Sequence, residues 1–364
     1  MRITSLRCTP VRVPRRQPFT SSLGIAAFSE NAVVEVETEE GEIGIGEVSS
    51  IWGRRGVGES EVVNDILAPA LVGKDPRQIN RMTALMDAAK SEAEPAKAGV
   101  EMALWDLLGR SLGVPVYALL GGLVRERLAL SHSLSMGPSH QVVAEAERLV
   151  QKGYRTLKIK VGQDADADFE TVRLVRECVG DEVKIRIDAN MGWGSIDEAM
   201  QNIQALESFN LELVEQPLGR ADLKGLGEIR KRVKVPIMAD ESVWTTRDAI
   251  DCLANSAANV FNVYVSEAGG LGPAAGIFAI AEAAGLPCII GSMPELGIGT
   301  AAHAHLAFAM RNIGFACDVN GVVYHADDVI RETLNIQDGW MLPPDGPGLG
   351  VTLDREKVDK YRVG

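Results

Sequence analysis

The feature that most constrains the fold is a regular alternation, beginning near Leu128, of short apolar runs with amphipathic stretches of helical period. The runs recur about every 24 to 30 residues, close to the roughly 30 residues that a strand and its crossover helix occupy in a parallel sheet. Eight runs follow one another, at residues 128–135, 156–161, 184–189, 211–216, 236–241, 260–265, 287–292 and 314–319. Eight such units in succession predict an α/β fold closed into a barrel of the TIM type.

An open, doubly wound sheet is the alternative fold for this pattern. Such a sheet usually carries a glycine-rich phosphate-binding loop after its first strand, and no such loop follows residues 128–135. The polar residues within the eight runs instead gather at their carboxyl ends, where barrel enzymes keep their active sites. The barrel is therefore the favoured prediction.

The first 125 residues have a different pattern. Residues 31–47 alternate apolar and polar side chains as an antiparallel strand does, and helical stretches follow as far as Gly113. We expect an α+β domain over 1–125, the barrel with its catalytic site over 126–329, and a C-terminal segment over 330–364. That segment is short and rich in Pro and Gly at 341–350, so it is expected to rejoin the N-terminal domain.

Composition narrows the class of partner. The formal charge of −13 argues against nucleic acid and anionic membranes, which attract basic surfaces, and favours a small-molecule substrate. The five cysteines are scattered, without the paired spacing of a zinc site or a disulfide framework. No apolar run is long enough for export or for a membrane span. We expect a cytoplasmic protein with reduced thiols, and a homo-oligomer.

Three carboxylates stand at the ends of three consecutive runs: Asp188, Glu215 and Asp240. Singly, such a residue is most often a helix cap or a solvated charge. Together, at one mouth of a barrel, three carboxylates need a cation, and their hard oxygen atoms suit Mg²⁺, with Mn²⁺ as the alternative. Since no cysteine or histidine joins them, zinc is disfavoured.

The run before these carboxylates carries Lys158 and Lys160, and the next carries Asn190 two residues after Asp188. Alternate residues of a strand face the same way, so both lysines share one face, as do Asp188 and Asn190. A lone Lys-x-Lys usually marks an exposed strand edge. Two lysines directly before three ordered carboxylates instead predict an active site.

At these residues the chain resembles the muconate-lactonizing enzyme subgroup of the enolase superfamily, also called the mandelate racemase/muconate lactonizing enzyme family. Lys158-x-Lys160, Asp188-x-Asn190, Glu215-Gln-Pro and Ala-Asp240-Glu-Ser match the family pattern in order and spacing, and residues 98–122 resemble its last capping-domain helix. The resemblance implies a modified (β/α)₇β barrel and an α+β capping domain completed by the C-terminus. It also implies Mg²⁺ on the three carboxylates and Lys160 as the base.

The chemistry of such an enzyme explains the need for these residue types. Removing a proton beside a carboxylate puts a second negative charge on the substrate, so positive charge must be fixed where the enolate develops. Lys158 is expected to hydrogen-bond the substrate carboxylate. Its charge and the metal would favour the neutral, basic form of Lys160. Asn190 suits the orientation of a carboxylate or a water, although a strand-end turn residue is an equally good interpretation.

The sixth run departs from the family pattern. The subgroup usually carries a second lysine there, shortly before a Gly-Gly pair, on the other side of the substrate. Counting back from Gly269 and Gly270 places Tyr264 at that position and Glu267 where a further lysine is common. Phenols titrate near 10, so Tyr264 is a poor base at pH 7 but can donate a proton or steady an oxygen. A packing aromatic is the other interpretation.

Histidine chemistry is not expected. The mandelate racemase branch has a histidine after the seventh strand, whereas residues 288–299 contain none and offer Glu295 in that loop. We interpret His303 and His305, in the helix that follows, as surface or interface residues.

Substrate contacts follow from the resemblance only, which assigns specificity to two capping loops, here Phe19 to Ser22 and Ile51 to Gly53 with Trp52, and to strand ends such as Ser133, Ser135 and Asp318. Dipeptide epimerases of the subgroup hold an ammonium group with Asp-x-Asp on the eighth strand, and this chain has Asp318-Val-Asn320, one carboxylate fewer. We expect an isomerase resembling muconate cycloisomerases. The alternatives are a dehydratase of a β-hydroxy carboxylate, a racemase or epimerase of an amino-acid derivative, and a non-catalytic paralogue.

Overall fold

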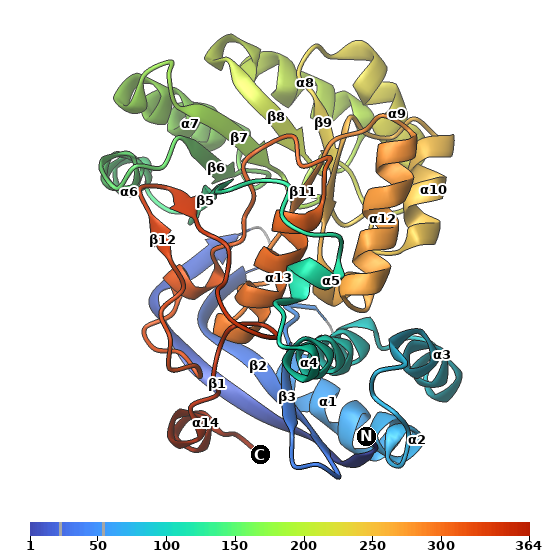
Figure 1. Cartoon of the computed structure of the whole chain (residues 1–364). Coiled ribbons are helices and arrows are strands. Elements are labelled where there is room, and N and C mark those ends of the chain that lie inside the picture. The colour runs from blue at the N-terminus through green and yellow to red at the C-terminus, as the bar shows by residue number, and fades with distance from the viewer. Residues whose placement is uncertain (22–23, 53–54) are drawn as a thin grey trace.

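The structure is a computed structural model that describes residues 1–21, 24–52 and 55–364. It has two parts, a parallel barrel and an α+β cap that lies below it in Figure 1. Among the described residues, no helix has both the length and the apolar character needed to cross a membrane.

Seven parallel strands form one sheet in chain order. They are β5 (Ser131–Leu134), β6 (Thr156–Lys160), β7 (Lys184–Asp188), β8 (Leu211–Glu215), β9 (Ile237–Ala239), β10 (Val260–Val263) and β11 (Cys288–Ile290). All of them lie within the first seven predicted runs. Their apolar residues belong to the buried hydrophobic core. Strands buried on both faces read as near-continuous apolar runs, which is why these segments stand out in the sequence.

The eighth predicted strand, residues 314–319, is not a continuous strand. It closes the barrel through isolated contacts: Ser131 N donates to Cys317 O at 2.9 Å on one side, and Asp318 N donates to Ile290 O at 2.9 Å on the other. Between them, Ala316 O accepts from Arg186 Nη1 at 2.9 Å, which takes that carbonyl out of the strand ladder. The prediction of a regular strand here was wrong, whereas its place in the barrel was right.

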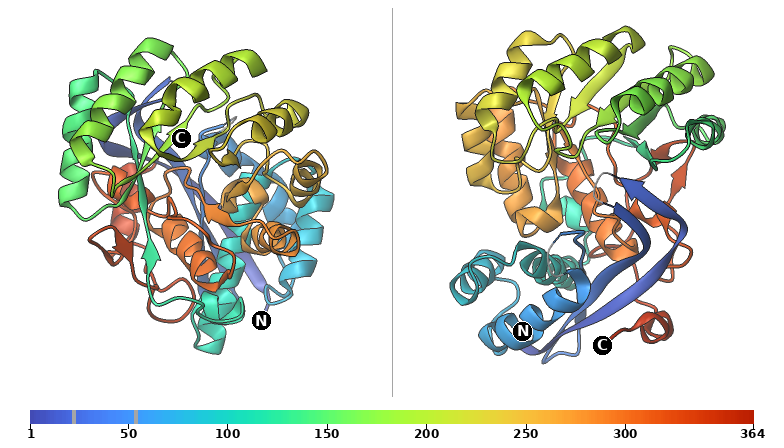
Figure 2. Two further views of the ribbon diagram at one scale, coloured as in Figure 1. Left: turned by 90° about the horizontal axis from the view of Figure 1, so that it is seen from above. Right: turned by 180° about the vertical axis from the view of Figure 1, so that it is seen from behind.

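Seven helices connect successive strands within residues 126–329, all of which the structure describes, as a (β/α)₇β barrel requires. They are α6 (Ser139–Gln151), α7 (Ala165–Val179), α8 (Ile196–Leu206), α9 (Leu223–Arg232), α10 (Thr246–Ala254), α12 (Leu271–Ala283) and α13 (Gly297–Ala309). Short helical turns add α11 (Val265–Ala268) and the 3₁₀ segments Glu207–Phe209 and Gly321–Tyr324. Seen from above, helices surround the sheet (Figure 2).

Helix α13 differs from the other barrel helices because it is buried along its whole length. It contacts β3 of the cap as well as β11. His303 and His305 are therefore buried within the chain, so of the two interpretations, surface or interface, the surface one was wrong. The sequence clue was the almost wholly apolar composition of residues 297–309, which is typical of a helix covered on all sides.

The cap begins with an antiparallel sheet of β1 (Ile3–Ser21), β2 (Gly24–Thr38) and β3 (Ile43–Val48). Its helical part comprises α1 (Arg55–Val62), a π-helical turn (Val63–Leu67), α2 (Ala68–Leu71), α3 (Ile79–Ala89), α4 (Glu94–Leu112) and α5 (Val116–Leu119). The β1–β2 hairpin curves up towards the barrel (Figure 2), where Thr20 N donates to Ser135 Oγ at 2.8 Å. The end of β1 is thus fastened beside the end of β5.

Two buried carboxylates of the cap fasten it to barrel helices. Glu101 of α4 accepts from Leu271 N and Gly272 N at the start of α12, at 2.8 and 2.9 Å. Glu47 of β3 accepts from Leu296 N and Gly299 N at the start of α13, at 2.8 and 2.7 Å. A carboxylate at a helix N-terminus satisfies free N–H groups and complements the helix dipole.

The C-terminal segment contacts both parts. Strand β13 (Trp340–Met341) pairs with β12 (Ile336–Gln337) on one side and with β4 (Leu128–Ala129), just before β5, on the other. Helix α14 (Arg355–Tyr361) then lies beside β1 (Figure 1), and Val363 N donates to Pro10 O at 3.0 Å. The boundaries at residues 125 and 329 stay a prediction.

Candidate active site

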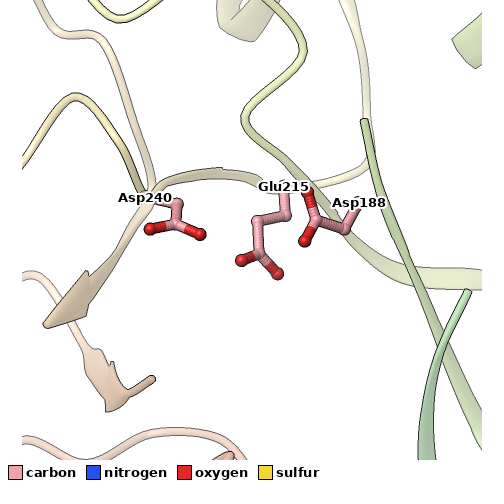
Figure 3. Close-up of side chains that lie close together, drawn as sticks. All are labelled: Asp188, Glu215 and Asp240. Atoms are coloured by element: carbon pink, nitrogen blue, oxygen red, sulfur yellow. The ribbon is translucent and has the colours of Figure 1, made fainter. Parts of the chain in front are cut away.

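Three carboxylates meet at the carboxyl ends of adjacent barrel strands. Asp188 ends β7, Glu215 ends β8, and Asp240 directly follows β9. One oxygen from each lies within 4.8 Å of the others, and all three side chains are buried (Figure 3). Adjacent parallel strands bring equivalent positions to one edge, which is how residues 27 and 25 positions apart come together.

The electrostatics of this cluster fit a divalent cation. Burial, with repulsion from Glu241 and Glu215, raises the pKa of Asp240 well above its usual range. Burial, with repulsion from Asp188, likewise raises the pKa of Glu215. Asp240 Oδ1 is buried and has no hydrogen-bond partner among the described residues. Three buried carboxylates, one of them with an unpaired oxygen, offer the hard oxygen ligands that Mg²⁺ binds.

Lys158 lies on the inner face of β6, as predicted, and its ammonium is engaged by acids. Lys158 Nζ donates to Asp318 Oδ2 at 2.5 Å and to Glu215 Oε1 at 3.3 Å. Burial alone would lower the pKa of Lys158, but the carboxylates, Asp318 foremost, raise it well above its usual value. This lysine is a fixed positive charge.

Lys160, two residues along β6, lies nearer the cavity. Its Nζ donates to Asp188 Oδ2 at 2.5 Å and to Asn190 Oδ1 at 2.9 Å. Asn190 in turn donates from Nδ2 to Glu241 Oε1 at 3.2 Å. Its backbone has φ of 42°, a left-handed conformation that asparagine tolerates better than most residues. Asn190 therefore orients Lys160 and Glu241.

Tyr264 directly follows β10, on the other side of the cluster from β6, and is buried. Its hydroxyl donates to Asp240 Oδ2 at 2.9 Å. Burial, with repulsion from Asp240 and Glu215, raises the pKa of Tyr264 well above its ordinary value. Gly291, just after β11, leaves room for the ring, since a Cβ there would lie 2.3 Å from the Tyr264 Cζ. The surroundings of Tyr264 favour the protonated form of its phenol.

Two further residues of the site were missed by sequence reasoning. Asn262 of β10 donates from Nδ2 to Glu215 Oε1 at 3.0 Å and to the Tyr264 hydroxyl at 3.1 Å. Gln216 Oε1 accepts from Asp240 N at 2.9 Å and so holds the next strand end. Asn262 lies two residues before Tyr264, and the alternation of side chains along a strand could have identified it.

A cavity of about 380 Å³ lies between the cluster and the cap. Lys158, Lys160, Asn190, Asp240 and Tyr264 line it, and so do Trp52, Ser133 and Asp318 among the predicted substrate contacts. Phe19 and Ser21 contribute from the hairpin tip, whereas Ser22 and Gly53 lie outside the described residues.

Two acids that the sequence analysis considered as parts of the site do not line the cavity. Glu295 is buried outside the cavity lining, where it accepts from Met293 N at 2.6 Å and from the Ser292 hydroxyl. Its carboxylate thus holds its own loop, and the structure does not bring it to the substrate side. Glu267 is likewise buried outside the lining, with the Ser266 hydroxyl as its donor.

Two family models match most of the chain. Residues 3–121 match the mandelate racemase/muconate lactonizing enzyme N-terminal domain, and residues 141–358 match the enolase C-terminal domain-like family.

Solved structures of characterised enzymes overlay closely. The N-succinyl Arg/Lys racemase of Bacillus cereus is 30% identical, with a TM-score of 0.97 over 100% of this chain and 99% of that one. The 2-chloromuconate cycloisomerase of Rhodococcus opacus is 34% identical, with a TM-score of 0.97 over 100% of both. The dipeptide epimerase of Enterococcus faecalis, in complex with Mg and the dipeptide L-Leu-L-Tyr, is 33% identical, with a TM-score of 0.92 over 97% of this chain and 100% of that one.

Proposed function

The chain belongs to the mandelate racemase/muconate lactonizing enzyme family of the enolase superfamily, and on that premise we propose that it is a Mg²⁺-dependent, one-base isomerase of the cycloisomerase type. In this proposal Lys160 moves the proton at the carbon beside a substrate carboxylate, by way of an enolate. The observation that carries the proposal is the unlike pair that flanks the carboxylate cluster, a lysine on one side and a buried phenol on the other.

The lysine side suits proton transfer. Lys160 lines the cavity, and its ammonium is positioned by Asp188 and Asn190 at 2.5 and 2.9 Å. A base must be held within hydrogen-bond reach of the proton that it moves, and two partners restrict where this flexible side chain can point. Lys160 can therefore take a proton from one face of the α-carbon, or return it there.

The phenol side does not suit that task. Tyr264 donates its own proton to Asp240, so loss of that proton would set a phenolate against a carboxylate at 2.9 Å. Like charges at that distance are strongly unfavourable in a buried site. Tyr264 is expected to stay protonated and to hold Asp240 in place.

The remaining charges support an enolate. Asp188, Glu215 and Asp240 would hold Mg²⁺, which when bound supplies fixed positive charge for the negative charge that develops on the substrate carboxylate. Lys158 contributes a second fixed positive charge from β6, because its acidic neighbours keep it protonated. Asn262 and Gln216 keep Glu215 and Asp240 oriented.

Epimerisation of a dipeptide is the second candidate, favoured by the likeness to the Enterococcus faecalis enzyme. Two features weigh against it. Epimerisation at a useful rate needs a base on each face of the α-carbon, and Tyr264 stands where the second would act. Asp318, the carboxylate available for a substrate ammonium, is already paired with Lys158 at 2.5 Å, and Asn320 donates to Ser131 O instead of offering a second acid.

Proton exchange followed by NMR in D₂O tests these alternatives. With Mg²⁺ and a panel of cis,cis-muconate and its lactone, β-hydroxy carboxylates and dipeptides, we expect the lactone and the diene acid to interconvert. On the α-carbon of the lactone, beside the carboxylate, deuterium should replace only one of the two hydrogens. Loss of water from a hydroxy acid would instead indicate a dehydratase, and rapid inversion of a dipeptide would contradict the one-base proposal. A non-catalytic paralogue predicts binding without any exchange.

A further inference from the structure

The barrel interior beside the carboxylate cluster, nearer the starts of the strands, contains an arginine that the proposed function does not use. Arg186 lies two residues before Asp188 on β7, so the two side chains share the inner face of the barrel. In the register of the sheet Arg186 stands opposite Lys158 of β6, and its side chain is fully buried. Branched apolar residues usually fill such a layer, because a buried charge loses its hydration. Filling the layer does not by itself explain an arginine here.

The guanidinium of Arg186 binds groups on two other strands of the barrel. Its Nε donates to Glu212 Oε2 of β8 at 2.6 Å, and its Nη1 donates to Ala316 O of the interrupted eighth strand at 2.9 Å. Glu212 stands at a register shift between β7 and β8, an irregularity of the kind that re-aims a side chain. One side chain thus connects β7, β8 and the eighth strand.

The contact with Ala316 O affects how the eighth strand meets β11. Asp318 N donates to Ile290 O at 2.9 Å, and in a regular parallel ladder Ile290 N would donate to Ala316 O. Arg186 binds that carbonyl, and Ile290 N instead donates to Cys317 Sγ at 3.3 Å. Sulfur is a weak acceptor, so this irregular pairing depends on the arginine. Without Arg186, Ala316 O is free to return to the ladder, and the chain up to Asp318 would shift.

Asp318 links this strand to the active site. Its Oδ2 accepts from Lys158 Nζ at 2.5 Å, and its Oδ1 accepts from the Ser131 hydroxyl. Burial alone would raise the pKa of Asp318, but the charges of Lys158 and then Arg186 lower it below its usual value. Asp318 is therefore an anion that both cations stabilise, two residues beyond the carbonyl that Arg186 holds. A shift of this strand would carry the partner of Lys158 with it.

We propose that Arg186 is a positioning residue for the α-proton transfer. By holding the Ala316 carbonyl it places Asp318, and Asp318 in turn places the ammonium of Lys158 beside the substrate carboxylate. This inference rests on the proposed function, in which Lys158 supplies fixed positive charge for the enolate. Since Arg186 does not line the cavity, it acts through this series of contacts and not on the substrate.

A crystal structure of Arg186→Met tests the geometric steps without any substrate. Methionine fills much of the same space but has no N–H donor. We expect Ile290 N to donate to Ala316 O, as in a regular ladder. Lys158 Nζ should then lie more than about 3.5 Å from Asp318 Oδ2, out of hydrogen-bond range. Calorimetry should still show stoichiometric Mg²⁺ binding, because the three carboxylates of the cluster are unchanged.

Arg176→Met is the matched control. Arg176 of α7 is another buried arginine. It also donates to backbone carbonyls, which lie before β7 and β8 and not in the eighth strand: Gly180, Val183, Phe209 and Asn210. A purely structural arginine of this kind should lower the melting temperature when replaced, and leave the contact between Lys158 and Asp318 as in the wild-type protein.

Kinetics test the functional step, with Mg²⁺ and the lactone of cis,cis-muconate as the probe. The dependence of α-proton exchange in D₂O on lactone concentration gives kcat and KM. Arg186→Met should lower kcat by about ten- to a hundredfold and leave KM within about threefold, because a charge misplaced by about 1 Å matters most when the enolate develops. Arg176→Met should keep both wild-type values. If Arg186→Met does not fold, Arg186→Lys should show the same changes to a smaller degree, since it keeps the charge but lacks the planar fork that reaches Glu212 and Ala316 O.

The outcomes separate this inference from the proposed function. An unchanged contact between Lys158 and Asp318 in the variant crystal would overturn the role of Arg186. Wild-type kcat in folded Arg186→Met, or an equal loss of kcat in Arg176→Met, would overturn it while leaving the one-base isomerase in place. If the wild-type protein exchanges no proton of the lactone, but the contact opens in Arg186→Met alone, the placement of Lys158 by Arg186 is supported and the proposed function is contradicted.

Discussion

The two sides of the carboxylate cluster carry side chains of unlike chemistry. On the β6–β7 side, Lys160 is a long amine with a 12% exposed side chain, tied to Asp188 and Asn190. On the β9–β10 side, Tyr264 is a rigid, 5% exposed phenol tied to Asp240 and Asn262. Both contact a candidate metal ligand, but only the amine can lose its proton without creating a new buried anion. The comparison teaches that similar placement around a metal cluster does not give similar chemistry.

Removal of the metal cluster should produce the largest effect, because both sides are organised around it. Glu215→Gln replaces a fully buried carboxylate that Lys158 and Asn262 contact. We expect calorimetry to show loss of stoichiometric Mg²⁺ binding and exchange to fall below detection, while the circular dichroism spectrum is retained. Glu241→Gln is the control: it lies outside the cluster of three and should keep stoichiometric Mg²⁺. Unchanged Mg²⁺ affinity in Glu215→Gln would show that the ligands are assigned wrongly.

The carboxylate cluster could be predicted from the sequence because a parallel barrel turns order along the chain into proximity. Asp188, Glu215 and Asp240 end three successive runs, so the fold prediction alone brings them to one mouth. The side on which Lys158 and Lys160 lie followed from the alternation of residues along a strand. In both cases a local pattern carries the information.

The partners that tune these residues could not be predicted in this way. Lys158 pairs with Asp318, 160 positions away, and Arg186 donates to Ala316 O, 130 positions away, within the interrupted eighth strand. Contacts of this range depend on side-chain lengths and on which groups remain unpaired after the barrel closes. The burial of His303 likewise depends on how the cap packs over α13. None of these has a local periodic signal.

The next largest effect should come from the base itself. Lys160→Ala should lower the rate of α-proton exchange by about 10²- to 10⁴-fold, the usual contribution of a general base, with Mg²⁺ binding preserved. Lys160→Arg is the sharper comparison, because arginine keeps the charge beside Asp188 but stays protonated at any accessible pH. Both variants should be inactive by NMR in D₂O. Substantial exchange in Lys160→Arg would mean that charge, not basicity, is the contribution of this side.

The smallest effect should come from the phenol. Tyr264→Phe removes two buried hydrogen bonds, one donated to Asp240 and one accepted from Asn262, which should cost about 1 to 3 kcal/mol of stability because both partners lose a bond. Exchange on the Lys160 face should stay within about tenfold of wild type, since only the orientations of Asp240 and Asn262 are disturbed. Tyr324→Phe is the matched control: it removes a half-buried phenol that lines the same cavity and accepts from Ser133 N of β5 at 3.0 Å. Thermal denaturation and stereospecific deuterium exchange measure the two effects.

If Tyr264→Phe slowed exchange as much as Lys160→Ala, and if the wild-type protein inverted the α-carbon rapidly, Tyr264 would have to act as an ionised base. The two sides would then be functionally alike despite their unlike chemistry.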